Sequence, residues 1–185
     1  NERGVSYADI VKWKMGYCPR GKYGGRIIIP SFNNEGDCNY FIARSYVGHH
    51  RRYLNPPCGR DIIYNELNVD WDEPIILCEG VFDAIVAGEN AIPILGSTLR
   101  EDSKLFQAIA VHDTPVYIAL DPDAEKKAHW IIRSLMKYDL EIKKLNVGTY
   151  EDIGSMSQSV FQEKLQNAEE VDGDFYFLEK QLKNI

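Results

Sequence analysis

The sequence lacks long apolar runs. None of its hydrophobic stretches approaches about 18 residues, the length that a helix needs to cross a membrane, and no apolar stretch follows residues 1–4, as it would in a signal peptide. Internal repeats and low-complexity segments are lacking too. With 44% hydrophobic and 26% charged residues, the composition is that of an ordinary globular protein. We therefore expect no membrane contact and no signal peptide.

Closely spaced cysteine pairs are also absent. A zinc ribbon needs cysteines about two to four residues apart, whereas those of this chain are separated by 20 positions each. They are Cys18, Cys38, Cys58 and Cys78. The spacing argues against a zinc site built from them, and Cys78, inside an apolar run, is expected to be a buried thiol. We expect a reducing, intracellular setting.

A net positive charge, common in proteins that bind nucleic acids, is missing as well, since the formal net charge is −7. The charge is unevenly spread. Residues 1–70 hold ten Lys or Arg and seven Asp or Glu, a net +3, whereas residues 71–185 hold eleven and twenty-one, a net −10. This asymmetry fits a surface that follows a phosphate backbone beside a cation-binding site, although ordinary variation of surface charge would produce it equally well.

The order of predicted elements indicates an α/β fold, a parallel sheet flanked by helices and preceded by a small α+β unit. The front unit has a helix over 5–15 with Ser6 as N-cap, strands over 26–30 and 38–46 joined by a turn at 33–37, and a basic loop over 47–60. The later strands cover 75–78, 91–95, 116–120 and 141–147, the last near an edge. The later helices cover 81–87, 100–111, 124–138, 157–167 and 173–183. These patterns predict an N-terminal basic subdomain over 1–70, a parallel α/β domain over 71–155 and a C-terminal helical segment over 156–185.

Two of the predicted strands end in acidic residues. Glu79 follows the first apolar run, and Asp121 and Asp123 follow the third. Ligands of open parallel sheets bind outside the carboxyl ends of the strands, so these carboxylates converge if the two strands are neighbours. At an effective dielectric constant of about 20, two like charges roughly 4 Å apart repel by about 4 kcal/mol, and such a cluster therefore favours a divalent cation or captured protons.

Oxygen ligands without histidine or cysteine favour Mg²⁺ or Mn²⁺, and bound Mg²⁺ usually shares its remaining positions with water and substrate phosphates. The acids thus predict phosphoryl or nucleotidyl transfer, or phosphodiester cleavage. The structural alternative is that each acid only caps a helix or forms a turn.

Three motifs resemble the TOPRIM signature, which is shared by DnaG-type primases, type IA and II topoisomerases, and some nucleases and recombination proteins. They are Glu79–Ala84, Leu95–Ser97 and Leu120–Ala124, within a likeness over about residues 72–155. The resemblance implies a TOPRIM-type sheet, a Mg²⁺ or Mn²⁺ cofactor, and Glu79, Asp121 and Asp123 as catalytic and metal-binding residues. It also implies Asp83 and, more loosely, Asp152 as additional metal-site acids. The chain departs from the family at Gly154, where a second acid is usual, and at Glu125–Lys127, where a glycine is usual.

The front half resembles the N-terminal subdomain of DnaG-type primases of bacteria and phages. The motifs are Arg3–Ser6, Gly16–Tyr17, Gly25–Pro30, Ala43–Arg44 and Arg52–Pro57. This resemblance implies a DNA primase core that synthesises short RNA primers on single-stranded DNA from ribonucleoside triphosphates. The residues implied in nucleic-acid binding are Arg26, Arg44, Arg52, Lys22, Tyr53 and Asn55.

Two alternatives remain open on the sequence: a TOPRIM-type metal-dependent nuclease, and a non-catalytic nucleic-acid-binding scaffold of recombination or repair. A topoisomerase is disfavoured because it needs a strand-cleaving tyrosine on a separate domain. The family also implies a zinc-binding module, a replicative helicase partner contacted through regions outside this sequence, and a cytoplasmic location, in a bacterium or in the host of a phage.

Overall fold

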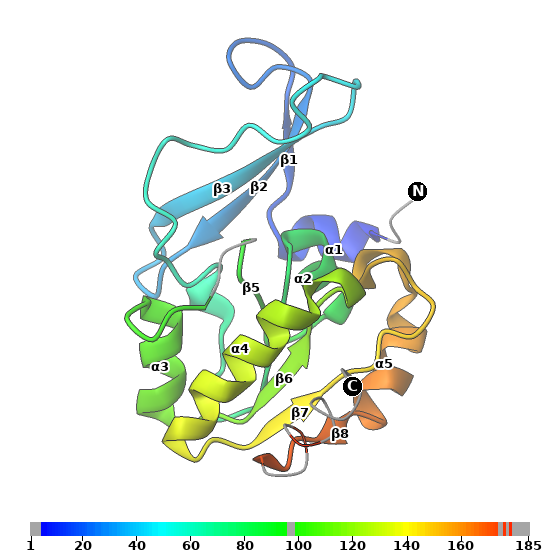
Figure 1. Ribbon diagram of the computed structural model, residues 1–185. Helices are drawn as coiled ribbons and strands as arrows, with labels where there is room; N and C mark the ends of the chain where they lie inside the picture. The colour runs from blue at the N-terminus through cyan, green and yellow to red at the C-terminus, as the bar shows by residue number, and fades with distance from the viewer. Residues whose placement is uncertain (1–4, 96–98, 174–175, 177, 179–185) are drawn as a thin grey trace.

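The computed structural model describes residues 5–95, 99–173, 176 and 178, which form two sheets at opposite ends of the molecule (Figure 1). The front sheet has three antiparallel strands in the order β1-β2-β3, and the second has five strands in the order β5-β4-β6-β7-β8. Four of these five strands run parallel to their neighbours, and only β8 is antiparallel. The predicted α/β fold class is therefore confirmed.

The front unit comprises α1 (Tyr7–Lys12), β1 (Gly16–Cys18), β2 (Arg26–Phe32) and β3 (Cys38–Ser45). Ser6 caps α1 as predicted: its Oγ accepts the Asp9 N–H at 3.1 Å, and Asp9 Oδ2 accepts the Ser6 N–H at 2.8 Å, which makes a capping box. The helix ends earlier than predicted because Lys14 adopts a left-handed φ of 48°. The chain then enters β1, a three-residue edge strand for which the sequence made no prediction.

The second unit alternates strands and helices. Its strands are β4 (Ile75–Cys78), β5 (Ala91–Pro93), β6 (Val116–Ala119), β7 (Ile142–Lys144) and β8 (Glu169–Glu170). Its α-helices are α2 (Val81–Ala87), α3 (Lys104–His112), α4 (Glu125–Leu135) and α5 (Gln158–Gln166). Single 3₁₀ turns are η1 (Glu66–Asn68), η2 (Pro122–Ala124), η3 (Met136–Tyr138) and η4 (Ile153–Ser155).

Two details of the second unit bear on the sequence predictions. Strand β7 lies near an edge of the sheet, as predicted, next to the edge strand β8, with which it pairs through Lys143–Glu170 and Lys144–Glu169. The helix predicted over 100–111 begins only at Lys104, where Ser103 Oγ accepts the Phe106 N–H. Most of the helix predicted over 173–183 lies outside the described residues; within that range, Gly173, Tyr176 and Leu178 are described, and they are helical. Gly96 and Ser97 of the second TOPRIM-like motif also lie outside the described residues.

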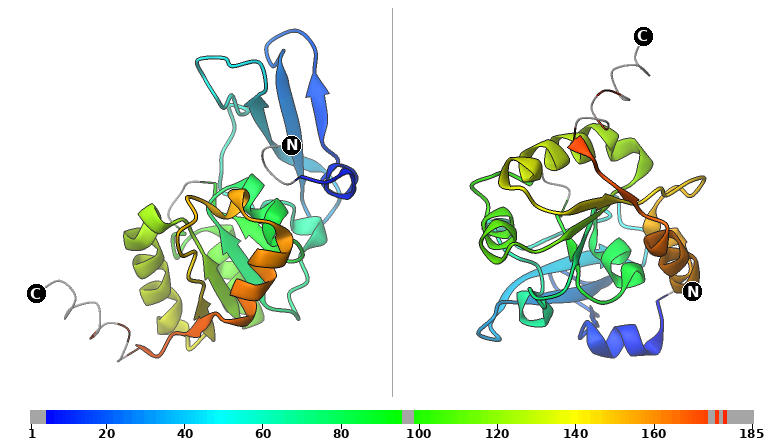
Figure 2. Two further views of the ribbon diagram at one scale, coloured as in Figure 1. Left: turned by 90° about the vertical axis from the view of Figure 1, so that its right-hand side faces the viewer. Right: turned by 90° about the horizontal axis from the view of Figure 1, so that it is seen from below.

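The core occupies both faces of the second sheet, and all four residues of β4 are buried. Ile75 and Leu77 pack with α3 and α4, whereas Ile76 and Cys78 pack with α2 and α5, so α4 and α5 lie on opposite sides of the sheet (Figure 2). The cluster that contains Ile76 and Cys78 also contains Trp13, Ile29 and Tyr40 of the front unit, together with Tyr64 of the segment between the two units. The two units therefore share a hydrophobic core. No described helix has both the length and the apolar character of a membrane span.

Candidate metal and nucleic-acid site

The two acidic strand ends lie side by side, which fulfils the condition under which the sequence predicts that the carboxylates converge. Strands β4 and β6 are direct parallel neighbours, with Cys78 opposite Ala119, so the residues that follow them emerge at the same edge of the sheet. One carboxylate oxygen from each of Glu79, Asp121 and Asp123 lies within 4.8 Å of the other two. The structure thus brings together three of the five residues predicted to bind metal.

Short local structures hold these acids in place. Pro122 starts the 3₁₀ turn η2, in which the Ala124 N–H donates to the Asp121 carbonyl at 2.9 Å, and the chain continues directly into α4. Gly80 is the N-cap of α2, and a Cβ at this position would lie only 3.0 Å from Asp83 Oδ2. A side chain at Gly80 would therefore crowd the carboxylate that fastens the start of α2.

The electrostatics of the cluster favour a bound cation. Among the described residues, Glu79 Oε2 and Asp121 Oδ1 are buried oxygens that accept no hydrogen bond. Burial raises the pKa of Asp121 to about 7, aided by the negative charges of Asp83, Glu79 and Asp152 and opposed by a backbone hydrogen bond from Ile153. Buried acceptors without a partner cost about 1–3 kcal/mol each. The three carboxylates could relieve this cost by binding a divalent metal, and their all-oxygen chemistry suits Mg²⁺ or Mn²⁺.

Asp83 lies beside the cluster but outside the group of three. It is 6% exposed, its Oδ2 accepts the Gly80 N–H at 2.8 Å, and its Oδ1 accepts the Gly154 N–H at 3.0 Å. The carboxylate therefore joins the start of α2 to η4. Asp152, the N-cap of η4, is close enough to raise the pKa of Asp121 and is likewise outside the group. Metal binding by Asp83 and Asp152 stays a prediction.

Lys127 is a residue of the site that the sequence reasoning missed. It lies in the first turn of α4, and its Nζ donates to Glu79 Oε1 at 2.5 Å. Lys127 follows Asp123 by four residues, a spacing that places two side chains on one side of an α-helix. Asp123 itself lies in the 3₁₀ turn η2, just before α4 begins at Glu125. This spacing was the signal available in the sequence, where Glu125–Lys127 stands out only as a departure from the family pattern.

Arg44 connects the front sheet with the acidic edge. Its Nη1 donates to the Tyr53 hydroxyl at 3.0 Å, and its Cζ lies 5.5 Å from the Tyr53 ring centroid and 4.6 Å from that of Phe82. Phe82 belongs to the first turn of α2, three residues after Glu79. Arg44 therefore packs between an aromatic ring of each unit, close to the acids.

The other residues predicted to bind nucleic acid fall into two groups. Arg52, Tyr53 and Lys22 are exposed, Tyr53 by 44%. Arg26, by contrast, is only 4% exposed, and its guanidinium donates to the Arg51 carbonyl at 2.8 Å and to the Arg52 carbonyl at 3.2 Å. Asn55 Oδ1 accepts the Ala43 N–H at 3.2 Å. The second group thus holds the basic loop against β3, and direct contact of Arg26 or Asn55 with nucleic acid stays a prediction.

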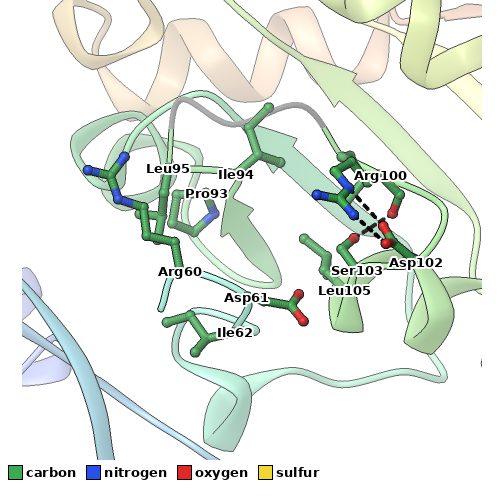
Figure 3. A pocket seen from close by; sticks show the side chains of 11 residues that line it. Arg60, Asp61, Ile62, Pro93, Ile94, Leu95, Arg100, Asp102, Ser103 and Leu105 are labelled. Carbon is green, nitrogen blue, oxygen red and sulfur yellow. Dashed lines mark hydrogen bonds and ion pairs between the residues drawn. The ribbon is translucent and has the colours of Figure 1, made fainter. Parts of the chain in front are cut away.

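A pocket of about 250 Å³ opens at the carboxyl end of β5, the strand beside β4 (Figure 3). Arg60 and Asp61 line one side, and Arg100, Asp102 and Ser103 line the other. Arg100 forms an ion pair with Asp102, and Asp61 Oδ1 accepts the Lys104 N–H at 3.0 Å. This last hydrogen bond fastens the segment after the basic loop to the start of α3.

Comparison with known proteins identifies the fold. No protein-family model matches the sequence, and no curated protein matches it either. Among solved structures, the zinc-binding and RNA polymerase domains of the Aquifex aeolicus primase match with a TM-score of 0.75 at 18% identity, over 91% of this chain and 54% of that chain. The DnaG primase catalytic domain bound to single-stranded DNA matches with a TM-score of 0.73 at 19% identity, over 91% and 69%.

The primase fragment of the bacteriophage T7 primase-helicase protein also matches, with a TM-score of 0.63 at 11% identity, over 89% of this chain and 71% of that chain. The chain thus spans just over half of the Aquifex structure and about 70% of the other two. It has the fold of DnaG-type and phage primase catalytic domains, which confirms the predicted resemblance at the level of fold.

Proposed function

We propose that this chain is the catalytic core of a DNA primase, which joins ribonucleoside triphosphates into short RNA primers on a single-stranded DNA template. The observation that carries the proposal is the cluster of Glu79, Asp121 and Asp123, whose oxygens lie within 4.8 Å of one another beside a front unit that carries exposed arginines. The shared fold supports it, since the compared structures are primase domains.

The donor set fits the metal that such a reaction needs. Glu79, Asp121 and Asp123 would hold Mg²⁺ or Mn²⁺, because they combine oxygen ligands with buried acceptors that lack hydrogen bonds among the described residues. When bound, the metal would align the triphosphate, lower the pKa of the attacking 3′-hydroxyl and offset charge on the leaving pyrophosphate. The protein itself contributes position and electrostatics.

The front unit supplies the template surface in this proposal. Arg44 and Arg52 would contact phosphates, which gives a binding strength that falls with salt and tolerates different sequences. Tyr53, with its half-exposed ring, would stack on a base. Arg26 and Asn55 act through the loop that they hold, because their polar atoms contact backbone atoms of residues 43, 51 and 52. Single-stranded DNA is bound in the compared DnaG structure.

The decisive experiment is a template-directed assay with labelled ribonucleotides and Mg²⁺ or Mn²⁺. Asp121→Asn and Asp123→Asn are expected to abolish primer synthesis while the circular dichroism spectrum stays that of the folded protein. Wild-type primer yield in either variant would reject the metal assignment.

The same assay separates the two alternatives. A nuclease needs the same acids but would shorten the template instead of extending a primer. A non-catalytic scaffold would give neither product, and Mn²⁺ would not raise its melting temperature, since a ligand that binds only the native state must stabilise it. A replicative helicase is a further proposed partner, contacted through regions outside this sequence, as the compared T7 protein is a primase-helicase.

A further inference from the structure

Lys127 brings a positive charge to the acid cluster from a position where a helix does not favour one. It is the third residue of α4, and the positive end of the helix dipole disfavours a cation in the first turn. Its ammonium nonetheless lies 2.5 Å from Glu79 Oε1, and both side chains are largely buried, with 20% and 26% exposed. The attraction of the acids, and not the helix dipole, therefore explains why the ammonium of Lys127 lies here.

Two other basic side chains of this region, Lys144 and Arg44, make contacts of their own. Lys144 Nζ donates to both carboxylate oxygens of Glu125, at 2.7 and 2.6 Å, and Arg44 lies between two aromatic rings. Lys126, next to Lys127 in the sequence, is exposed. Lys127 is therefore well placed to neutralise Glu79 when no metal is present.

A bound divalent cation would compete with Lys127 for the Glu79 carboxylate. Glu79 Oε1 accepts from Lys127 while Oε2 is buried without a hydrogen bond among the described residues. A metal on this carboxylate would repel the nearby ammonium, and the four-carbon stem of lysine allows the ammonium to move. Metal held by carboxylates usually shares its other positions with substrate phosphates, which would offer the displaced ammonium a new anionic partner at the same site.

We propose that Lys127 exchanges partners when the site is loaded. It neutralises Glu79 in the metal-free protein, and it contacts the triphosphate of the incoming nucleotide once a divalent cation has taken the Glu79 carboxylate. This inference rests on the proposed function, because it assigns Lys127 a task in the same site. Lys127 is then a nucleotide-binding residue that also sets the metal affinity.

The first test measures Mn²⁺ affinity by calorimetric titration of the 185-residue chain without nucleotide. Lys127→Met is expected to bind Mn²⁺ about fivefold more tightly, which is about 1 kcal/mol, because the competing ammonium is gone. Lys126→Met removes the same charge one position away and is expected to stay within about twofold of wild type. Unchanged or weaker Mn²⁺ binding by the Lys127 variant would overturn the exchange, since the lysine would then merely orient Glu79. Lys127→Gln serves as a second neutral variant should the methionine variant not fold.

The second test measures ATP affinity at saturating Mn²⁺, again by calorimetry and without template. Lys127→Met is expected to weaken ATP binding about tenfold, a typical effect of losing a charged contact. Lys127→Arg keeps the charge and is expected to retain most of the affinity, and Lys126→Met should match wild type. Unchanged ATP affinity in Lys127→Met would show that the lysine is only a counter-ion and would refute the exchange.

These measurements separate the inference from the proposed function. A wild-type chain that binds Mn²⁺ and ATP as expected, with the expected variant effects, but makes no primer would reject the primase function and keep the exchange. A wild-type chain that makes primer, with unaltered metal and ATP binding in Lys127→Met, would reject the exchange alone. A wild-type chain that binds no Mn²⁺ would overturn both.

Discussion

Asp83 offers a test of how the acidic edge is held together. Its carboxylate is buried and accepts one N–H from the start of α2 and one from η4. In Asp83→Asn, the amide oxygen can replace one acceptor, but the amide nitrogen would face the other N–H, donor against donor. The substitution therefore removes at least one hydrogen bond to a charged group and leaves a buried N–H without an acceptor.

The expected magnitude follows from these two contacts. A hydrogen bond to a charged group contributes about 1.5–3 kcal/mol, and the stranded N–H adds to the loss. Removing the negative charge of Asp83 also removes its repulsion of the Asp121 carboxylate, whose pKa is raised partly by Asp83. Part of the lost stability is therefore recovered. We expect a net decrease of about 2–3 kcal/mol in the free energy of unfolding, which for a domain of this size lowers the melting temperature by roughly 4–12 °C.

Thermal unfolding with and without Mn²⁺ provides the measurement, and Asp72→Asn, at an exposed acid, is the charge-matched control. Asp83→Asn should melt earlier than the control, yet Mn²⁺ should raise its melting temperature as much as that of wild type. An unchanged melting temperature would refute the tethering role. Loss of the Mn²⁺-induced rise would instead favour the sequence prediction that Asp83 is itself a metal ligand.

Three further predictions concern the charges around the site. Arg44→Ala should weaken binding to a single-stranded oligonucleotide about tenfold and reduce the salt-dependence slope by about 0.7, as measured by fluorescence anisotropy at several salt concentrations; an unchanged slope would contradict a phosphate contact. Arg26→Met should lower the free energy of unfolding by about 3 kcal/mol, because three carbonyls lose a charged donor, and urea denaturation that matches wild type would be inconsistent with this. Because the pKa of Asp121 is raised to about 7 from 3.8, the unfolded chain loses this proton more readily, so the contribution of Asp121 to stability is present below about pH 4 and is lost as the pH rises towards 7. Mn²⁺ binds the ionised carboxylate, so the Mn²⁺ affinity should fall by up to tenfold per pH unit below about pH 7. Asp121→Asn should flatten the dependence of stability on pH. A wild-type Mn²⁺ affinity that does not change with pH would contradict protonation of Asp121 in this range.

Strong local patterns allowed the position of the acids to be predicted. The apolar runs Ile75–Cys78 and Val116–Ala119 are β4 and β6 within one residue of the predicted bounds, because strands buried on both faces need continuous apolar sequence. Once those strands are neighbours, the place of Glu79 and Asp121 follows from chain direction alone. The three-residue β1 and the two-residue β8 carry too little pattern to be predicted, and tertiary pairing alone defines them.

Side-chain partners far apart in the sequence were beyond such reasoning. Lys127 and Glu79 are 48 residues apart, and their contact depends on the register between β4 and β6. Arg26 looked like a surface arginine in a basic unit, but it is buried because the loop after β3 folds back over it and offers carbonyls 25 and 26 residues away. In both cases the residue type predicts a positive charge, but only the folded chain decides which group that charge contacts.

The shared core explains how the basic front sheet and the acidic edge keep their relative position. Tyr64, in the segment between the two units, donates its hydroxyl to the Ile29 carbonyl of the front sheet at 2.7 Å, and both residues are buried in the same cluster as Cys78, which immediately precedes Glu79. Arg44 adds a second contact between the units through Phe82. Closely packed interiors resist small displacements, so the distance between the basic front sheet and the acids is set by packing. A preformed geometry of this kind is what a reaction driven by position and electrostatics requires.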